Sequence, residues 1–375
     1  MRLTAKVKLR PTPEQRGALL ETLQTANRAC NEISKLAWDN QQFKQFPLHR
    51  LAYRMIRSRF NLTAQMAVRC VAKVADAYKA GKHKQRTFNL RGSIPYDNRI
   101  LSWMLDRQEV SIWTTGGREH IPFVCGEHQL RLLQSQRGES DLCLIGGEFY
   151  LFTTCDVETP PPAEVEWFLG VDLGIQNIAT DSDGDRFAGG HVNGLRKRHA
   201  KLRSKLQSTG TESAHKVMKK RRCKEARFAK DVNHCIAKRV VEKAKDTGRG
   251  IALEQLKGIR ERVTVRRSQR RQHHAWSFYD LQQKIVYKAQ IAGIPVVFVD
   301  PKNTSRQCPA CGHASKSNRQ SQAAFLCVEC GFSGHADHIA ARNIAGRVAV
   351  NQPNVGIAIP HCDHLQACPV HGAGR

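Results

Sequence analysis

The sequence predicts a multidomain α+β protein, in which a small β-barrel with a helical insert precedes an α/β domain that carries an inserted cysteine ribbon. Three observations predict this architecture. The first 160 residues combine one alternating strand, three amphipathic helices and short apolar runs between glycine-containing turns. From residue 167 onward, expected strands and helices follow one another with carboxylates at their ends. Two Cys-x2-Cys pairs lie between the last expected strand and the last expected helix. A chain of 375 residues is long enough for two or three domains.

The chain begins with a pattern of strand followed by helices. Residues 2–10 alternate apolar and polar, mostly basic side chains, which is typical of a half-buried strand. Thr12, Pro13 and Gln15 then form a helix start, with a Thr N-cap, Pro at the first helical position and Gln completing a capping box. Apolar residues at spacings of three and four predict three helices within residues 11–83.

From residue 84 to 160 the pattern is that of a small barrel or curled sheet, which the first strand is expected to join. The segments LRLLQS (130–135) and EFYLFTTCDV (148–157) predict two of its strands. The proline run at 160–162 then predicts a stiff linker and a domain boundary.

The second half begins with WFLGVDLGIQNIAT (167–180), which predicts a strand, a tight turn and a second strand. The later patterns predict, in order, a strand at 185–188, a helical hairpin at 191–246, a strand at 251–254, an amphipathic helix at 275–292, a buried strand at 294–299 and a last helix opening at 334–337. The tail at 351–375 has no periodicity and is expected to be poorly ordered.

Three carboxylates lie at the ends of these elements: Asp172, Glu254 and Asp337. An open α/β sheet gathers its site at the carboxyl ends of its strands, where three acids would repel unless cations neutralise them. Hard cations such as Mg²⁺ prefer oxygen ligands. Each acid alone could be a turn, strand-end or helix-cap residue. Together, in this order, they predict a catalytic site with two Mg²⁺, for which Mn²⁺ is a substitute, that hydrolyses phosphodiesters.

Four cysteines have the spacing of a tetrahedral zinc site. Cys308 and Cys311 form one pair, Cys327 and Cys330 the other, and 15 residues separate the pairs. Glycines follow both pairs and allow tight knuckle turns. Because four thiolates leave no open position for water, we expect one structural Zn²⁺.

The basic charge points to a nucleic-acid partner rather than a membrane. The formal net charge is +27, from 60 Lys and Arg against 33 Asp and Glu. Residues 191–246 hold 18 basic and five acidic side chains, and residues 256–274 hold seven and one. A charge run is often only a solvated face. Here the candidate nucleic-acid-binding residues are Arg196, Lys197, Arg198, Lys219, Lys220, Arg221, Arg222, Arg266, Arg267, Arg270 and Arg271. No apolar run approaches the roughly 18 residues of a membrane helix, so a cytosolic protein is expected.

Four segments carry a resemblance to a known family. They are GVDLGIQNIAT around Asp172, IALEQLKGIR around Glu254, TSRQCPACG with LCVECG in the cysteine ribbon, and ADHIAARNI around Asp337. RFAKDVNH (227–234) and HHAWSFYDLQQKI (273–285) are further similar segments. The chain resembles the TnpB (OrfB) family encoded by insertion sequences, the compact relatives of type V CRISPR effectors. Specific similarity covers about the last 210 residues, and the N-terminal part agrees only in layout.

The resemblance implies a domain layout. It consists of a wedge barrel (1–10 and 84–160), a helical recognition insert (11–83), an RNase H-like (RuvC) nuclease domain (163–300 and 334–350) and a zinc ribbon (301–333). The three acids match the RuvC triad of the family. The implied activity is that of a nuclease guided by an RNA from the element's end. It opens double-stranded DNA beside a short target-adjacent motif and cuts both strands in one site. We expect it to act as a monomer.

Three other functions are compatible with parts of this pattern. An RNA-guided repressor that binds without cutting would be favoured by loss of a triad acid, and none is lost. A cut-and-paste transposase also uses acidic triads, but the position of the ribbon before the last helix favours the guided nuclease. A small type V CRISPR effector of the same ancestry is the third. The chain departs from the family at Ile339, where Asn is common, and at Gln255, where Asp often follows the Glu.

Overall fold

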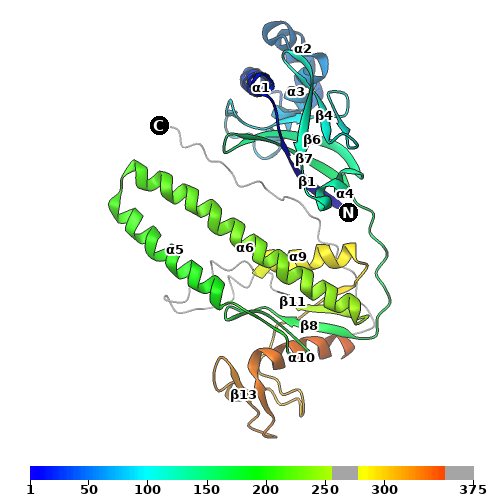
Figure 1. Ribbon diagram of the computed structural model, residues 1–375, viewed down its shortest axis with the longest axis vertical. Helices are drawn as coiled ribbons and strands as arrows, with labels where there is room; N and C mark the ends of the chain where they lie inside the picture. Colours follow the sequence, from blue (N-terminus) through cyan, green and yellow to red (C-terminus); the bar gives the residue numbers. More distant parts are fainter. Residues whose placement is uncertain (256–277, 351–375) are drawn as a thin grey trace. The chain divides into compact units, whose positions relative to one another are not determined.

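The computed structural model describes residues 1–255 and 278–350, without the side chains of residues 222, 223, 349 and 350 (Figure 1). The chain divides into two compact units, of which the first spans Met1–Glu158 and the second begins at Thr159. The tail at 351–375, for which disorder was predicted, lies outside the described residues. None of the described helices combines the length and the apolar character that crossing a membrane would need.

A seven-stranded antiparallel sheet forms the body of the first unit, with the first strand of the chain near its centre. Tyr96 on one edge strand donates a hydrogen bond from its hydroxyl to the Trp113 carbonyl near the opposite edge, so the sheet is nearly closed. This confirms the predicted curled sheet. In the order β2-β6-β7-β1-β5-β4-β3, its strands are β2 (Ile94–Tyr96), β6 (Gln136–Ile145), β7 (Glu148–Asp156), β1 (Arg2–Leu9), β5 (Gly117–Val124), β4 (Glu109–Thr114) and β3 (Leu101–Met104).

Three helices stand between β1 and β2 in the chain: α1 (Pro13–Asp39), α2 (Gln45–Phe60) and α3 (Ala64–Lys79). The predicted capping box is present, because Thr12 Oγ1 accepts from the Gln15 N–H at 3.3 Å and Gln15 Oε1 accepts from the Thr12 N–H at 3.1 Å. Thr63 caps α3 by a single hydrogen bond, in which its Oγ1 accepts from the Met66 N–H at 3.4 Å. The apolar faces of the three helices share one core with the sheet.

One predicted strand is wrong. The segment LRLLQS lies mostly in a short helix, α4 (Glu127–Leu133). Its buried side chains, Leu132 and Leu133, are adjacent in sequence and do not alternate as a half-buried strand requires. Leu and Arg are strong helix formers, and Glu127 in the first turn suits the positive end of the helix dipole. The second segment, EFYLFTTCDV, forms β7 as predicted.

The second unit is built on a five-stranded mixed sheet. Its first three strands form an antiparallel meander, and the last two run parallel to the first. In the order β10-β9-β8-β11-β12, the strands are β10 (Arg186–Ala188), β9 (Asn177–Asp181), β8 (Phe168–Asp172), β11 (Gly250–Glu254) and β12 (Val296–Val299). All five were predicted, within two residues at each end.

Helices cover both faces of this sheet (Figure 1). The predicted helical hairpin is formed by α5 (Gly190–Thr209) and α6 (Glu212–Asp246). On one face, α6 packs with α9 (Phe278–Ile291) over the sheet, and on the other lies α10 (Ala336–Val350). The cysteine segment between β12 and α10 contains a 3₁₀ turn (Lys316–Asn318) and the small hairpin β13 (Ala324–Leu326) and β14 (Ser333–His335).

Strand alternation assigns the residues of β8 to the two faces. Leu169 and Val171 lie in the core with α6 and α9, so Gly170 and Asp172 point to the α10 side. At Gly170, α10 comes so close that a Cβ would lie 2.1 Å from the Ala341 carbonyl oxygen. Only glycine therefore permits this approach of the helix to the strand.

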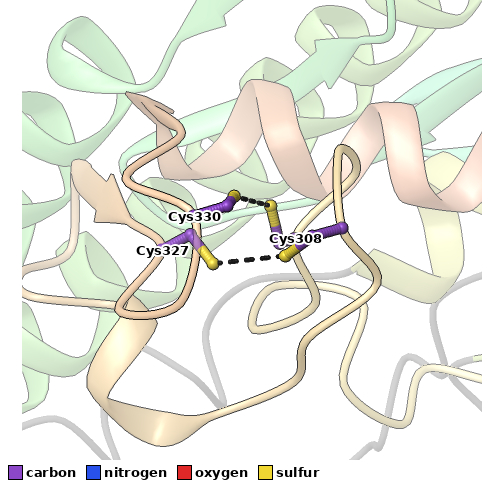
Figure 2. A group of neighbouring side chains, drawn as sticks. Cys308, Cys327 and Cys330 are labelled. Atoms are coloured by element: carbon purple, nitrogen blue, oxygen red, sulfur yellow. Dashed lines mark hydrogen bonds between the residues drawn. The ribbon is translucent and has the colours of Figure 1, made fainter.

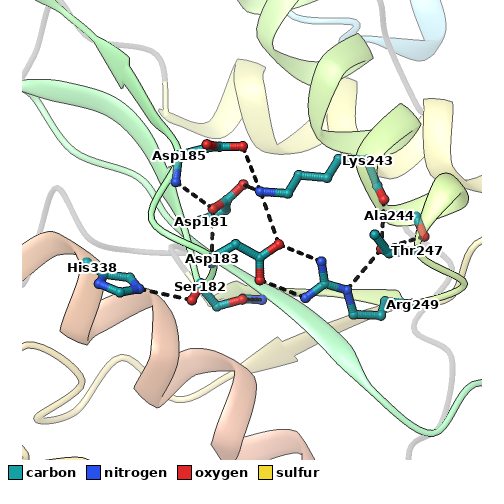
Figure 3. A network of polar contacts seen from close by, with 10 residues as sticks. Asp181, Ser182, Asp183, Asp185, Lys243, Ala244, Thr247, Arg249 and His338 are labelled. Carbon is teal, nitrogen blue, oxygen red and sulfur yellow. Dashed lines mark hydrogen bonds and ion pairs between the residues drawn. The ribbon is translucent and has the colours of Figure 1, made fainter.

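A cluster of ion pairs attaches the C-terminal end of α6 to the turn between β9 and β10 (Figure 3). We call it the Lys243 cluster; it comprises Lys243, Arg249, Asp181, Asp183 and Asp185. The Lys243 ammonium lies 2.6, 3.1 and 2.7 Å from the carboxylates of Asp181, Asp183 and Asp185. The cluster therefore fixes the base of the helical hairpin to the sheet.

The same turn is also attached to α10. His338 Nε2 lies 3.0 Å from the carbonyl oxygen of Ser182 (Figure 3). The β9–β10 turn therefore contacts a helix on each face of the sheet, and one of these contacts is adjacent to Asp337.

Candidate functional site

Asp172 and Glu254 end two neighbouring parallel strands. The register pairs Val171 of β8 with Leu253 of β11, so each acid is the next residue at the same edge of the sheet. Parallel strands lie about 4.8 Å apart. Glu254 belongs to the same alternating set as Ala252, which packs toward α10. Both carboxylates are therefore presented at the carboxyl end of the sheet, on the α10 side.

Asp337 comes to this edge from the first turn of α10. Asn177, at the start of β9, donates a hydrogen bond from Nδ2 to Asp337 Oδ2 at 2.9 Å. Arg319 Nη2 lies 3.7 Å from Asp337 Oδ1. Two elements from opposite ends of the unit's sequence thus hold the third acid beside the strand ends.

The charges of Glu254 and Asp337 act on the carboxyl group of Asp172. Burial raises the pKa of Asp172 well above its usual value, and the charges of Glu254 and Asp337 raise it further. Burial also raises the pKa of Glu254. A site in which carboxylates are costly to ionise together favours a bound cation over three free charges.

Among the described residues, the four ribbon cysteines form the one group of three or more His, Cys, Asp or Glu side chains whose ligand atoms all lie within 4.8 Å of one another. The oxygens of Asp172, Glu254 and Asp337 therefore span more than this distance.

Three polar residues of this site were not predicted from the sequence. Asn177 and Arg319 contact Asp337, and the Thr304 hydroxyl donates to Glu254 Oε1. Each is distant in sequence from the acid that it contacts, and polar residues in loops carry no periodic pattern. The sequence contains one weak indication that Asn177 and Thr304 belong to the site, because both lie inside segments that resemble the family.

The two residues at which the chain departs from the family differ in environment. Ile339 is buried with Phe325, Cys308 and Cys327 in the core of the ribbon. Gln255 is exposed, and its N–H donates to the Val299 carbonyl. Ile339 therefore stabilises the contact between α10 and the ribbon.

The four predicted cysteines come together (Figure 2). The Sγ atoms of Cys308 and Cys330 lie 3.6 Å apart, as do those of Cys311 and Cys327. A tetrahedron with zinc–sulfur bonds of about 2.3 Å has sulfur–sulfur edges of about 3.8 Å. The geometry therefore fits one tetrahedral ion.

A buried asparagine joins the two cysteine knuckles. Asn318 donates from Nδ2 to the carbonyls of Arg306 and His313, and its Oδ1 accepts from the Val328 N–H. Arg306 and His313 lie close to the first cysteine pair, and Val328 lies between the second pair. This side chain holds the two halves of the ribbon together independently of the sulfurs.

Most of the described candidate nucleic-acid-binding residues are exposed on the helical hairpin. Lys197 and Arg198 are exposed on α5, and Lys219, Lys220 and Arg221 on α6, whereas Arg196 is half-buried. The Arg222 side chain and the whole of Arg266, Arg267, Arg270 and Arg271 lie outside the described part of the chain.

A hollow of 430 Å³ lies between the two helices of the hairpin. Its lining combines the cations of Lys220, Arg221 and Lys224 with the apolar side chains of Leu195 and Phe228. Cations beside aromatic and aliphatic side chains suit a phosphate backbone with its attached sugars and bases.

Two family models match the second half of the chain. The model described as "Probable transposase" (OrfB_IS605) matches residues 152–260, and the model "Cas12f1-like, TNB domain" matches residues 278–344. Together they span the strands that carry Asp172 and Glu254, the cysteine ribbon and the first turn of α10.

Curated relatives and a solved structure extend the match. A CRISPR-associated endodeoxyribonuclease Cas12f1 of Sulfoacidibacillus thermotolerans is 27% identical over 88% of this chain and 92% of its own length. A TnpB-like protein of Methanocaldococcus jannaschii is 29% identical over 49% of this chain and 69% of its own.

The fold agrees with that of a Cas12f1 solved by cryo-electron microscopy in a complex with sgRNA and target DNA. The TM-score is 0.56 at 16% identity, over 87% of this chain and 82% of the other. By these matches and by the motifs around its acids and cysteines, the chain is similar to the TnpB (OrfB) proteins and to the Cas12f effectors.

Proposed function

We propose that the chain is an RNA-guided DNA endonuclease that cuts both strands of double-stranded DNA in a single site beside a short target-adjacent motif. The observation that carries this proposal is the meeting of Asp172, Glu254 and Asp337 at the carboxyl edge of the sheet. The Cas12f1 relative that aligns over 92% of its own length is named an endodeoxyribonuclease, which supports the same activity here.

The proposed domain layout follows from the same family. A three-stranded antiparallel meander followed by two parallel strands, with acids at the strand ends, supports an RNase H-like (RuvC) assignment for the second unit. The nearly closed sheet and its three-helix insert support a wedge barrel and a recognition insert in the first. The bounds that we propose remain 1–10 and 84–160 for the wedge, 11–83 for the insert, 163–300 and 334–350 for the RuvC domain and 301–333 for the ribbon.

The three acids are the proposed ligands of two Mg²⁺ ions, or of Mn²⁺ in their place. When bound, such ions activate a water and stabilise the leaving oxygen of the phosphodiester. Around them, Asn177 donates a hydrogen bond to Asp337, and the Thr304 hydroxyl donates one to Glu254. The Arg319 guanidinium beside Asp337 places a positive charge at the same edge, where a DNA phosphate would arrive.

The cysteine group is the proposed site of one structural Zn²⁺. Its sulfur spacing fits a tetrahedral ion, and four thiolates leave no position for a reacting water. The basic residues of α5 and α6 are proposed to hold the guide RNA or the heteroduplex through its phosphates, with sequence selected by base pairing.

Reprogramming the guide tests the proposal. Purified protein is loaded with a guide RNA whose target segment has been changed, and is given two plasmids that carry the adjacent motif, one matched to the new guide and one to the old. We expect only the matched plasmid to be linearised. Cleavage that ignores the guide, or proceeds equally without RNA, would favour an unguided nuclease or a transposase. Guide-dependent binding without cutting would favour a repressor.

A further inference from the structure

Glu254 has a specific hydrogen-bond donor in the structure. Thr304, which is 3% exposed, donates from Oγ1 to Glu254 Oε1. Burial raises the pKa of Glu254, and this hydrogen bond opposes the rise. A half-buried carboxylate with one oxygen fixed by a hydroxyl presents its other oxygen in a defined direction.

Thr304 is itself held in place by α10. Asn343, which is 9% exposed, donates from Nδ2 to the carbonyl oxygens of Thr304 and Gln307, both at 2.7 Å. One helical turn further on, Arg347 donates to the Lys302 carbonyl at 2.6 Å. The segment from residue 302 to 307 is thus attached to α10 through three of its carbonyls.

The helix that fixes Thr304 also carries the third acid. Asp337 precedes Asn343 by six residues on α10, and Cys308 follows Gln307 directly in the chain. A single rigid helix therefore sets the position of Asp337 through its own backbone and the position of Glu254 through Asn343 and Thr304.

We propose that Thr304 is a positioning residue for Glu254 and that Asn343 fixes Thr304 for this role. The inference rests on the proposed function, because it assigns the two residues to the alignment of a metal-binding carboxylate.

If the Thr304 hydroxyl only stabilised a turn, the effects of removing it would differ from those of a positioning role. Thr304 Oγ1 also lies 3.1 Å from the Pro301 carbonyl, so the hydroxyl could serve only to close a turn. The hydroxyl has one proton, and a turn role would leave Glu254 unaffected by its loss. Loss of a turn bond lowers thermal stability, whereas loss of a positioning bond lowers metal affinity.

Thr304→Val removes the hydroxyl at nearly constant shape, and Thr304→Ser retains it. Thr209→Val is the matched control, because the Thr209 hydroxyl bonds only the Lys205 carbonyl of its own helix among the described residues. Two readouts are compared: Mn²⁺ affinity by isothermal titration calorimetry without nucleic acid, and the Mg²⁺ concentration that gives half-maximal plasmid cleavage. Zinc content and melting temperature report the integrity of the fold.

Thr304→Val is expected to weaken Mn²⁺ binding and to raise the Mg²⁺ requirement by about 10–100-fold, the usual cost of losing a partner of a metal ligand. Thr304→Ser should restore most of both, and Thr209→Val should change neither. Thr304→Ala, which is smaller, serves if the valine variant does not fold.

Three results would overturn the inference: Thr304→Val and Thr304→Ala with unchanged metal dependence, a serine variant that fails to recover, or a melting temperature that falls with no change in Mn²⁺ affinity. A wild-type protein that cuts no DNA under any guide would instead contradict the proposed function. The Mn²⁺ titration would still decide the role of Thr304.

Discussion

Asn177 donates a hydrogen bond to Asp337 across 2.9 Å, although 160 residues separate them in sequence. The bond joins the start of β9 to the first turn of α10, at the edge where β8 and β11 end. Arg319, from the cysteine ribbon, reaches the other oxygen of Asp337. The third acid is therefore held by residues from two separate parts of the second unit.

Asp172→Ala, Glu254→Ala and Asp337→Ala should each lower DNA cleavage by roughly 10²–10³-fold or more, the usual range for loss of one strong electrostatic contact to a transition state. Guide-RNA binding should stay near the wild-type value, because the basic residues lie on other elements.

Chelating Mg²⁺ should have the same effect as the substitutions. The measurements are single-turnover plasmid cleavage and filter binding of RNA. Asp246→Ala, at an exposed acid at the end of α6, is the control. A triad variant that cuts at the control rate would refute the assignment.

One zinc ion per chain should be measured by elemental analysis of freshly purified protein. The double substitution Cys308→Ser with Cys311→Ser should abolish the zinc signal and make the ribbon susceptible to proteolysis, because its apolar core is small. Cys235→Ser, at an exposed cysteine outside the ribbon, should retain the full zinc content. Active protein without zinc would contradict the prediction.

Charge reversal at Lys219 should weaken nucleic-acid binding with little dependence on sequence, because phosphate contacts position a strand without reading it. Lys245→Glu, about 39 Å further along the same helix by its rise per residue, is the matched control. Each lost phosphate contact should reduce the steepness of the slope of log affinity against log salt concentration by about 0.7–0.9. Reversal of the whole Lys219 to Arg222 run should flatten it further. Equal salt slopes for the Lys219 and Lys245 variants would argue against a specific surface on this part of the hairpin.

The Lys243 cluster predicts a pH-dependent contribution to stability. The two hydrogen bonds from the Arg249 guanidinium, at 2.6 and 2.9 Å, hold the pKa of Asp183 below its usual value. A carboxylate with a lowered native pKa stabilises the fold above its unfolded pKa of about 3.9, and this stabilisation is lost as the pH falls through the native pKa. Asp183→Asn should therefore cost about 0.5–1 kcal/mol at pH 7, a small value because Asp183 is 37% exposed and solvent screens the pair.

The measurement is the difference in unfolding free energy between Asp183→Asn and wild type, by urea titration at pH 7 and at pH 3. The difference should shrink at the lower pH. Effects shared by both proteins, such as zinc loss in acid, cancel in this comparison. A difference that stays constant or grows at pH 3 would show that the ion pair is not its source.

Patterns of local origin were predictable from the sequence. The Thr12 capping box, the strands of the second unit and the Cys308 to Cys330 group depend on residues that are near in sequence or have diagnostic spacing. The helix at 127–133 was missed because a run of four residues with three leucines is compatible with a strand or a helix. The burial of the adjacent residues Leu132 and Leu133, which the structure shows, distinguishes the helix from a half-buried strand.

The acids of the candidate site were predictable because each lies at the end of a recognisable strand or in the first turn of a recognisable helix, whereas the residues around them were not. Asn177, Thr304 and Arg319 reach the site from turns and from the ribbon. Their contacts depend on how α10 lies against β8, which the close approach at Gly170 determines. No periodicity in a single sequence reports such a tertiary distance.

The Lys243 cluster also has a practical consequence for handling the protein. Asp181 is 2% exposed and Lys243 25% exposed, so added salt screens this ion pair much less than it screens exposed charges. The exposed cations of the hairpin bind phosphates less tightly as the ionic strength rises. A molar salt wash should therefore strip copurifying RNA from the immobilised protein while α6 stays anchored to the sheet, which allows bare protein to be recovered and reloaded with a chosen guide.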